Sequence, residues 1–119
     1  MSLAADVVTG IVALLHVYFM VLEMFLWDTP YGRKTFAMSA EKSAATRQLA
    51  MNQGLYNGFL AAGLAWGLAL GPGGFAIKAF FLACVLVAGV FGALTASRKI
   101  LFVQALPAAI ALVLLFLAR

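Results

Sequence analysis

The chain has 119 residues, of which 66% are hydrophobic and only 10% are charged. Soluble domains carry about 25% charged residues, so this composition excludes a chain that is mainly a soluble domain and is typical of one that lies in lipid. The formal net charge of +4 is explained by basic residues in the connections between the predicted helices, so we expect no nucleic-acid partner.

Four apolar windows predict four membrane-spanning helices. A helix needs about 20 apolar residues to cross about 30 Å of hydrocarbon. Windows of this kind cover residues 5–27, 49–70, 75–96 and 100–118. The last two connections are very short, as they are between antiparallel helical neighbours. We therefore expect an all-α fold in which residues 1–119 form a single transmembrane domain, an integral-membrane four-helix up-and-down bundle.

The first window lies where a secretory signal would lie. No Lys or Arg precedes it, however, and its apolar run is interrupted by His16 and Glu23. A signal sequence has a basic start and an uninterrupted apolar core, so we expect this helix to be retained in the membrane.

The connection at residues 28–48 is the long polar segment of the chain. It opens with turn-forming residues from Thr29 to Gly32, which are expected to end the first helix. Ser39 is a favourable N-cap and strong helix formers follow it. The second helix is therefore expected to begin there, before it enters the membrane.

The basic residues predict the orientation of the bundle. Six of the eight lie in the first and third connections: Arg33, Lys34, Lys42, Arg47, Arg98 and Lys99. Only Lys78 and Arg119 lie on the opposite side. By the positive-inside rule, the two basic connections face the cytoplasm and both termini lie on the non-cytoplasmic side. At that outer surface, Asp6 and Lys78 are expected to form an ion pair.

Small residues recur at every fourth position in the second and third predicted helices. The rows are Gly54, Gly58 and Ala62; Gly63, Gly67 and Gly71; Gly89 and Ala93; and Gly92 and Ala96. Such rows let two helical backbones approach closely. They suit contacts within one bundle as well as contacts between copies, so a homo-oligomer through these rows is a further expectation.

Several polar side chains lie inside the predicted spans, where an ionised side chain costs roughly 2.5 to 3.5 kcal/mol at a helix centre. In the first helix, Thr9, His16 and Glu23 follow one another at intervals of seven and share one face. The predicted topology places Glu23 at the depth of the polar starts of the second and fourth helices, with His16 deeper. The candidate ligand-binding residues are His16, Met20, Glu23, Asn52, Gln53, Tyr56, Asn57 and Gln104. We expect them to line a polar pocket that opens to the cytoplasm and ends at His16.

These residues also have purely structural explanations. Glu23 could reach the interface or pair with Arg33 or Arg47. His16 could be a neutral side chain bonded to a backbone carbonyl, and the amides could hold helices together. In the fourth helix, Pro107 is expected to free a backbone carbonyl four residues earlier as an extra acceptor.

Three stretches carry a family resemblance. They are HVYFMVLEMFLW at residues 16–27, TPYGRKTF at residues 29–36 and NQGLYNGFLAAGL at residues 52–64. With them the chain resembles, over nearly its whole length, the small bacterial membrane proteins of domain of unknown function family 1304. The resemblance implies a four-helix protein of the bacterial cytoplasmic (inner) membrane, and it implies no substrate. It groups six signature residues: His16, Glu23, Asn52, Gln53, Tyr56 and Asn57.

Two classes of function fit a polar pocket in lipid. The first is binding or proton-coupled transport of a small lipophilic or cationic compound, with Glu23 exchanging a proton for the ligand. The layout is similar to that of the small multidrug-resistance transporters, although their sequence motifs are not found here. The second is a membrane-embedded enzyme of isomerase or hydrolase type, in which His16 and Glu23 act as acid and base and Asn57 or Tyr56 polarises a substrate oxygen.

No cofactor is predicted. Cys84 is the only cysteine, so neither a Cys-rich metal site nor a disulfide framework is expected. Haem with His16 as an axial ligand is an alternative within the enzyme hypothesis. A third hypothesis makes the chain a structural subunit of a larger membrane complex, because the rows of small residues suit a partner's helix as well as a neighbouring one.

Overall fold

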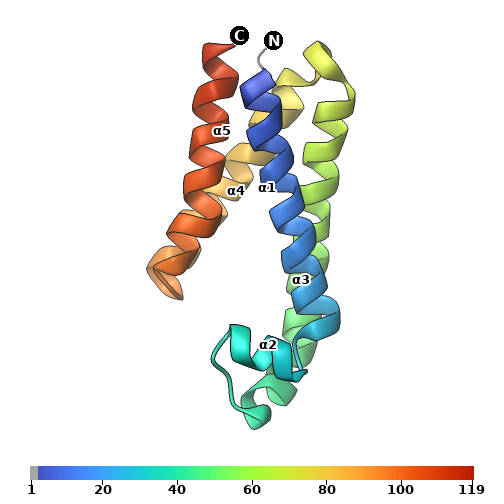
Figure 1. The fold of residues 1–119 in the computed structure, drawn as a ribbon, viewed down its shortest axis with the longest axis vertical. Coiled ribbons are helices and arrows are strands. Elements are labelled where there is room, and N and C mark those ends of the chain that lie inside the picture. The colour runs from blue at the N-terminus through green and yellow to red at the C-terminus, as the bar shows by residue number, and fades with distance from the viewer. Residues whose placement is uncertain (1–2) are drawn as a thin grey trace. The chain divides into compact units, whose positions relative to one another are not determined.

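The computed structural model describes residues 3–119, and over this range the chain is all-helical, as predicted. It has five α-helices, joined or extended by short π and 3₁₀ segments, and no strand in the described range (Figure 1). In chain order the elements are α1 (Leu3–Val21), the π segment η1 (Leu22–Leu26), α2 (Pro30–Thr35), α3 (Ala40–Ala69), the 3₁₀ turn η2 (Gly71–Gly74), α4 (Phe75–Thr95), the π segment η3 (Leu101–Ala105) and α5 (Leu106–Leu117).

The described residues form two compact units. Unit 1 contains the chain up to Leu14 together with Leu60–Arg119, and unit 2 contains Leu15–Phe59. Because α1 and α3 run through both, each unit holds one part of each of these helices.

Unit 1 holds the main apolar core. Its buried side chains come from α1, α3, α4 and α5 and include Val12, Leu64, Leu82, Val85 and Ala111. Within the unit, α4 packs against η3 and α5 (Figure 1). A Cβ built on Gly89 would lie 2.6 Å from the backbone nitrogen of Ala105, so only glycine allows this approach.

The predicted rows of small residues pack within the chain. In unit 1, a Cβ on Gly63 would lie 2.4 Å from the ring of Phe81, and one on Gly67 would lie 2.6 Å from Cγ of Lys78. Gly63 and Gly67 therefore serve contacts between helices of one copy, whereas nothing lies within 4 Å of a Cβ at Gly71. A homo-oligomer through the same rows stays a prediction.

The last helical stretch begins with a π turn, η3, which ends just before Pro107. Proline has no N–H, so the carbonyl four residues before it loses its α-helical partner. Just before the proline, the N–H of Leu106 donates to the carbonyl of Leu101, which lies five residues back rather than the four of an α-helix. This is the bonding of a π turn. The window predicted at residues 100–118 thus corresponds to η3 followed by α5.

Two helical stretches in the described range are long and apolar enough to cross a membrane. They are Leu3–Leu26, with 24 residues and a mean hydropathy of 2.0, and Gly71–Thr95, with 25 residues and a mean hydropathy of 2.3. The stretch Leu101–Leu117 is apolar but shorter. Helix α3 has 30 residues, but its polar first turns and its amide side chains lower its hydropathy. The two long apolar stretches support association with a membrane.

The connection at residues 28–48 contains a short helix that the sequence did not predict. The hydroxyl oxygen of Thr29 accepts the N–H of Gly32 at 3.2 Å and so caps α2. Pro30 follows at the first helical position, where its missing N–H has no helical partner to lose. Ser39 caps α3 as predicted, because its Oγ accepts a backbone N–H three residues later at 3.0 Å.

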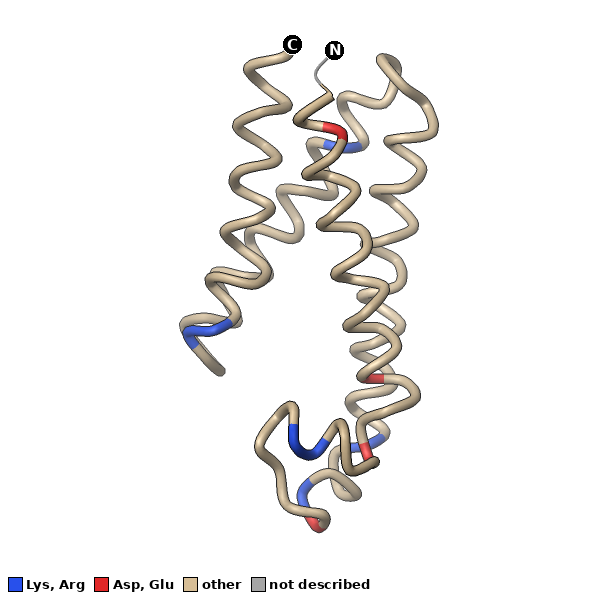
Figure 2. The backbone as a smooth tube through the Cα atoms, in the orientation of Figure 1, with Lys and Arg blue, Asp and Glu red and all other residues tan. Residues whose placement is uncertain are grey.

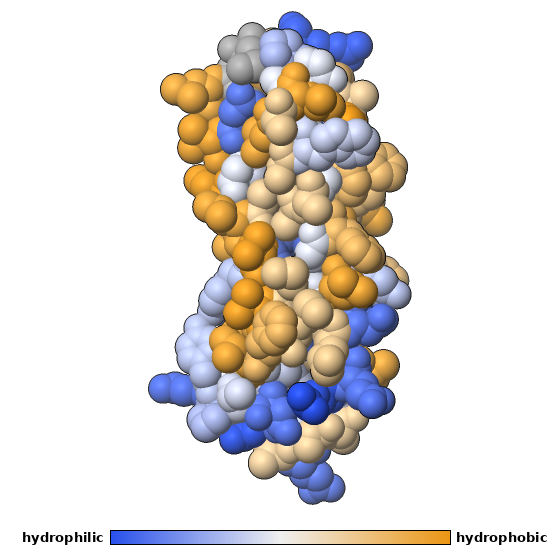
Figure 3. Space-filling model, turned by 90° about the vertical axis from the view of Figure 1, so that its right-hand side faces the viewer, coloured by the Kyte–Doolittle hydropathy of each residue, from blue (hydrophilic) through white to orange (hydrophobic). Residues whose placement is uncertain are grey.

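Charged residues gather at the ends of the helices. In unit 2 they surround α2 and the start of α3 (Figure 2). The space-filling view shows hydrophilic side chains at the same place and apolar side chains over the helical stretches (Figure 3). In each unit the polar surface is therefore concentrated at helix ends and connections.

Candidate functional site

The candidate site lies in unit 2, where Glu23 of η1 meets Asn57 of α3. The amide Nδ2 of Asn57 donates a hydrogen bond to the carboxylate oxygen Oε1 of Glu23. Asn57 is only 8% exposed, and Glu23 is half-buried. The contact therefore joins the first helix to α3 through two of the polar side chains that the sequence singled out.

Two glycines of α3 allow the backbones to come this close. A Cβ on Gly54 would lie 2.6 Å from Cγ of Met24 and 3.0 Å from Cβ of Glu23. A Cβ on Gly58 would lie 2.8 Å from Sδ of Met20. The carboxylate is thus approached by an amide from α3 and has two methionines near it on its own helix.

Glu23 lies in a π turn that the sequence did not predict. A π turn holds one residue more than an α turn and shifts the side chains that follow it around the helix axis. Such turns occur frequently at functional sites. The π turn of η3 is followed by Pro107, whereas no proline lies within η1 or directly after it.

His16 lies on α1, seven residues before Glu23, and is fully buried. Its ring packs edge-on against Phe19, with the ring centroids 5.3 Å apart and an angle of 74° between the planes. Seven residues of α-helix rise about 10 Å, so the imidazole and the carboxylate lie at different depths along the first helix.

The other predicted site residues lie outside the Glu23–Asn57 contact. Those on α3 are exposed: Asn52, Gln53 and Tyr56. Gln104 belongs to η3, in unit 1. The contact between the first helix and α3 therefore holds only part of the predicted pocket, and the wider pocket stays a prediction.

Beside the site, side chains of the residues after η1 form hydrogen bonds with side chains in the first turns of α3. The indole Nε1 of Trp27 donates to Oγ1 of Thr46 at 3.0 Å, and the hydroxyl of Ser43 donates to Oδ1 of Asp28 at 2.6 Å. Arg33 pairs with the same Asp28 oxygen at 3.0 Å. Sequence reasoning missed this network. The signal that it left in the sequence is the spacing of Ser43 and Thr46, which puts two hydroxyls on one face of α3.

The same contacts act on the charge of Asp28. The hydrogen bond from Ser43 lowers the pKa of the Asp28 carboxyl below its ordinary value; desolvation opposes this effect and the Arg33 cation adds to it. The ionised form of Asp28 is therefore favoured in the folded chain. Because Arg33 is engaged with Asp28, the explanation in which Arg33 pairs with Glu23 does not describe this structure.

The chemistry available at the site is that of a single carboxylate. Two carboxylate oxygens offer about four lone-pair positions, so one amide donor leaves room for a proton or a cation. Within residues 3–119, no group of three or more His, Cys, Asp or Glu side chains is placed to hold a metal ion.

The family described as "Protein of unknown function (DUF1304)" matches residues 10–116, which include Glu23 and Asn57. The chain belongs to this family. The resemblance drawn from the three sequence stretches is thereby confirmed. A relative from Lactococcus lactis subsp. lactis (strain IL1403), described as "Uncharacterized protein YpaA", is 28% identical over 115 residues, which are 95% of this chain and 97% of the relative. No solved structure matches the chain.

Proposed function

We propose that this chain is a multi-pass protein of the bacterial inner membrane that binds a small lipophilic or cationic compound at Glu23 and exchanges it for a proton. In this proposal, four helical stretches form an up-and-down bundle with both termini on the non-cytoplasmic side. The observation that carries the function is the hydrogen bond from Asn57 to Glu23, which joins two helices.

Exposed apolar side chains support the crossing of the bilayer. Each of the four long helical stretches has a large apolar residue that is more than half exposed: Leu14, Phe59, Phe91 and Leu117 are examples. Soluble monomers rarely expose wide apolar patches, whereas lipid would cover them. The six basic residues of the first and third connections support a cytoplasmic position for both connections.

In this proposal the carboxylate of Glu23 is the group that exchanges a proton for the ligand. An ionised carboxylate without a counter-charge is costly among apolar helices. A proton or a cationic ligand removes that cost, and each occupant excludes the other because both neutralise the same charge. This competition is the coupling that proton exchange requires.

The surroundings of Glu23 suit a lipophilic ligand. Met20 and Met24 lie near it on the first helix, and both pack against glycines of α3. Methionine side chains are flexible and polarizable, so they adapt to apolar ligands of different shapes. The site therefore combines one charge with an adaptable apolar wall.

Uptake of ethidium, a lipophilic cation, into proteoliposomes tests the proposal. When a pH gradient is imposed, the wild-type chain should accumulate ethidium beyond the level of protein-free liposomes. Glu23→Gln keeps an acceptor for Asn57 but removes the charge, so it should reduce gradient-driven uptake by about tenfold or more.

Glu41→Gln is the matched control, because Glu41 is an exposed acid in the first turn of α3. Its uptake should equal that of the wild type. Equal uptake by Glu23→Gln and the wild type, or uptake that does not respond to the gradient, would contradict proton exchange at Glu23.

A further inference from the structure

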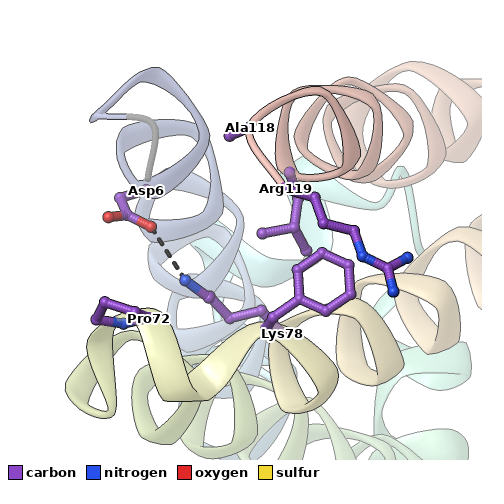
Figure 4. A pocket seen from close by; sticks show the side chains of 7 residues that line it. Asp6, Pro72, Lys78, Ala118 and Arg119 are labelled. Carbon is purple, nitrogen blue, oxygen red and sulfur yellow. Dashed lines mark hydrogen bonds and ion pairs between the residues drawn. The ribbon is translucent and has the colours of Figure 1, made fainter.

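A cavity in unit 1 combines two cationic side chains with an apolar wall (Figure 4). Its volume is about 370 Å³, and its lining includes Asp6, Pro72, Phe75, Lys78, Leu115 and Arg119. These residues come from the first turn of α1, from η2, from the start of α4, from the last turn of α5 and from the residues that follow it. None of them takes part in the Glu23–Asn57 contact.

Lys78 is the buried cation of this cavity. It is only 3% exposed, and its Nζ lies 3.3 Å from Oδ1 of Asp6, as predicted for this pair. A buried ammonium group requires a counter-charge, which Asp6 supplies. The ammonium group carries three donors, however, so one bond to Asp6 leaves it able to bind a second anion.

Arg119 is the second cation. Its guanidinium carbon lies 4.9 Å from the centroid of the Phe75 ring. Figure 4 shows Lys78 reaching toward Asp6, while the side chain of Arg119 extends in another direction. A guanidinium that lies over an aromatic ring still carries N–H donors that an oxyanion can accept. The ionisable side chains that line the cavity are Lys78, Arg119 and Asp6, and their charges sum to a single positive charge.

The rest of the wall is apolar. Phe75 and Leu115 line the cavity, and Phe75 packs edge-on against Phe116 with ring centroids 5.2 Å apart. A single negative charge next to an apolar tail matches this arrangement. In a spanning bundle, helix ends lie at the depth of the lipid headgroups, and the cavity lies at helix ends.

We infer that this cavity binds an anionic phospholipid, whose phosphate is held by Lys78 and Arg119 and whose acyl chain lies along Phe75 and Leu115. The inference shares the membrane placement of the proposed function but uses a separate site. Asp6 then has two opposing effects on lipid binding. It holds Lys78 in position, and it also competes with the lipid phosphate for the ammonium group of Lys78.

Native mass spectrometry of the full chain, released from dodecyl maltoside, tests the inference by counting bound lipid. Phosphatidylglycerol should bind as one molecule per chain about tenfold more tightly than phosphatidylcholine with the same acyl chains. Inorganic phosphate at the same concentration should not displace it, because the free ion makes no contact with the apolar wall.

Two variants should change the affinity for phosphatidylglycerol in opposite directions. Arg119→Gln should weaken binding about tenfold, since it removes a charge-assisted bond at an exposed position. Asp6→Asn should strengthen binding severalfold, because Lys78 no longer divides its donors between two anions. Lys99→Gln and Glu23→Gln are the controls and should bind as the wild type does, whether or not Glu23→Gln has lost ethidium uptake.

Several results would overturn the inference. Equal binding of the two lipids would exclude recognition of the anionic headgroup. Displacement of the lipid by inorganic phosphate would show that the cavity binds small anions and does not recognise a phospholipid. Unchanged binding by Arg119→Gln, or weaker binding by Asp6→Asn, would show that the phosphate does not lie between the two cations. Circular dichroism of each variant confirms that its helices are intact.

Discussion

At the scale of single residues, Gly32 controls how closely α2 approaches the end of the first helix. A Cβ on Gly32 would lie 2.0 Å from the carbonyl oxygen of Leu26 and 2.5 Å from that of Trp27. Both atoms belong to the backbone and cannot turn aside as a side chain can. Gly32→Ala should therefore lower the free energy of unfolding by about 1 to 3 kcal/mol, measured by denaturation in detergent.

Gly73→Ala is the matched control for this change. Nothing lies within 4 Å of a Cβ built at Gly73, and the residue is exposed. Its substitution should change the free energy of unfolding by less than about 0.5 kcal/mol. If the two variants unfold alike, the close approach at Gly32 is not the cause.

Ser43→Ala should lower the stability of the folded chain near neutral pH more than it does in acid. Removal of the Ser43 hydroxyl should bring the pKa of Asp28 back toward its ordinary value. A carboxyl whose pKa is lowered by folding adds stability above its unfolded pKa of about 3.9 and loses it as the pH falls through the folded pKa. The melting temperature of Ser43→Ala should therefore lie below that of the wild type near neutral pH.

The difference between Ser43→Ala and the wild type should shrink in acid, where Asp28 is protonated in both. Thr35→Ala is the control, because Thr35 is exposed and its hydroxyl bonds only a carbonyl of its own helix, at 2.8 Å. A difference that persists unchanged at low pH would mean that Ser43 stabilises the fold without Asp28.

The candidate site could be predicted in part at this scale. Because polar side chains are costly in lipid, the sequence pointed to Glu23 and Asn57, and the structure joins them. However, polar side chains at the same depth in the membrane need not point in the same direction. Each residue turns an α-helix by about 100°, so Tyr56 points well away from Asn57 although the two are adjacent. For this reason Asn52 and Tyr56 are exposed while Asn57 is buried. Gln53, one turn before Asn57 on the same face, is also exposed, so the face alone does not determine burial.

At the scale of elements, the end of α2 has an avoidable strain. Ala37 has a φ of 52°, in the left-handed region that favours glycine. The N–H of Ala37 donates to the carbonyl of Lys34 at 3.3 Å, and that of Met38 donates to the carbonyl of Arg33 at 2.8 Å. This is the bonding of a Schellman motif, in which the residue after the C-cap is usually glycine.

Ala37→Gly should raise the free energy of unfolding by about 0.5 to 1 kcal/mol, because glycine adopts this conformation without a steric cost. Ala45→Gly is the comparison, since Ala45 is exposed inside α3, where glycine costs about 1 kcal/mol. Denaturation in detergent measures both. A loss of stability at both positions would contradict the strain assigned to Ala37.

The elements themselves could be predicted where local rules decide them. Ser39 and the helix formers after it predicted where α3 begins. Pro107 was expected only to free a backbone carbonyl, and the π turn of η3 beside it was not predicted. The tetrapeptide from Thr29 to Gly32 is equally consistent with a turn and with the capped start of a helix, which is why α2 was missed. The π turn of η1 has no local cause in the sequence, so no local rule could predict it.

At the scale of the whole molecule, composition predicted an all-helical chain, and the described residues are all-helical. The four apolar windows correspond to α1 with η1, to α3, to α4, and to η3 with α5. Within residues 3–119, hydropathy identifies two helical stretches that could span a membrane. The amides and small residues of α3 and the shortness of the last stretch weaken the signal there. The proposal that α3 and the last stretch also cross the membrane rests on the distribution of charge and of exposed apolar side chains.

Both proposals depend on the placement of these helices across the bilayer, and labelling of single cysteines tests that placement most directly. Cys84 is the only cysteine, so Cys84→Ser provides a background into which Lys34→Cys, Lys99→Cys or Gly73→Cys can be introduced. In spheroplasts, a membrane-impermeant maleimide should label Gly73→Cys alone, and in inverted membrane vesicles it should label Lys34→Cys and Lys99→Cys instead. Labelling of all three from one side, or of Lys34→Cys and Lys99→Cys from opposite sides, would contradict a four-helix bundle with both basic connections in the cytoplasm.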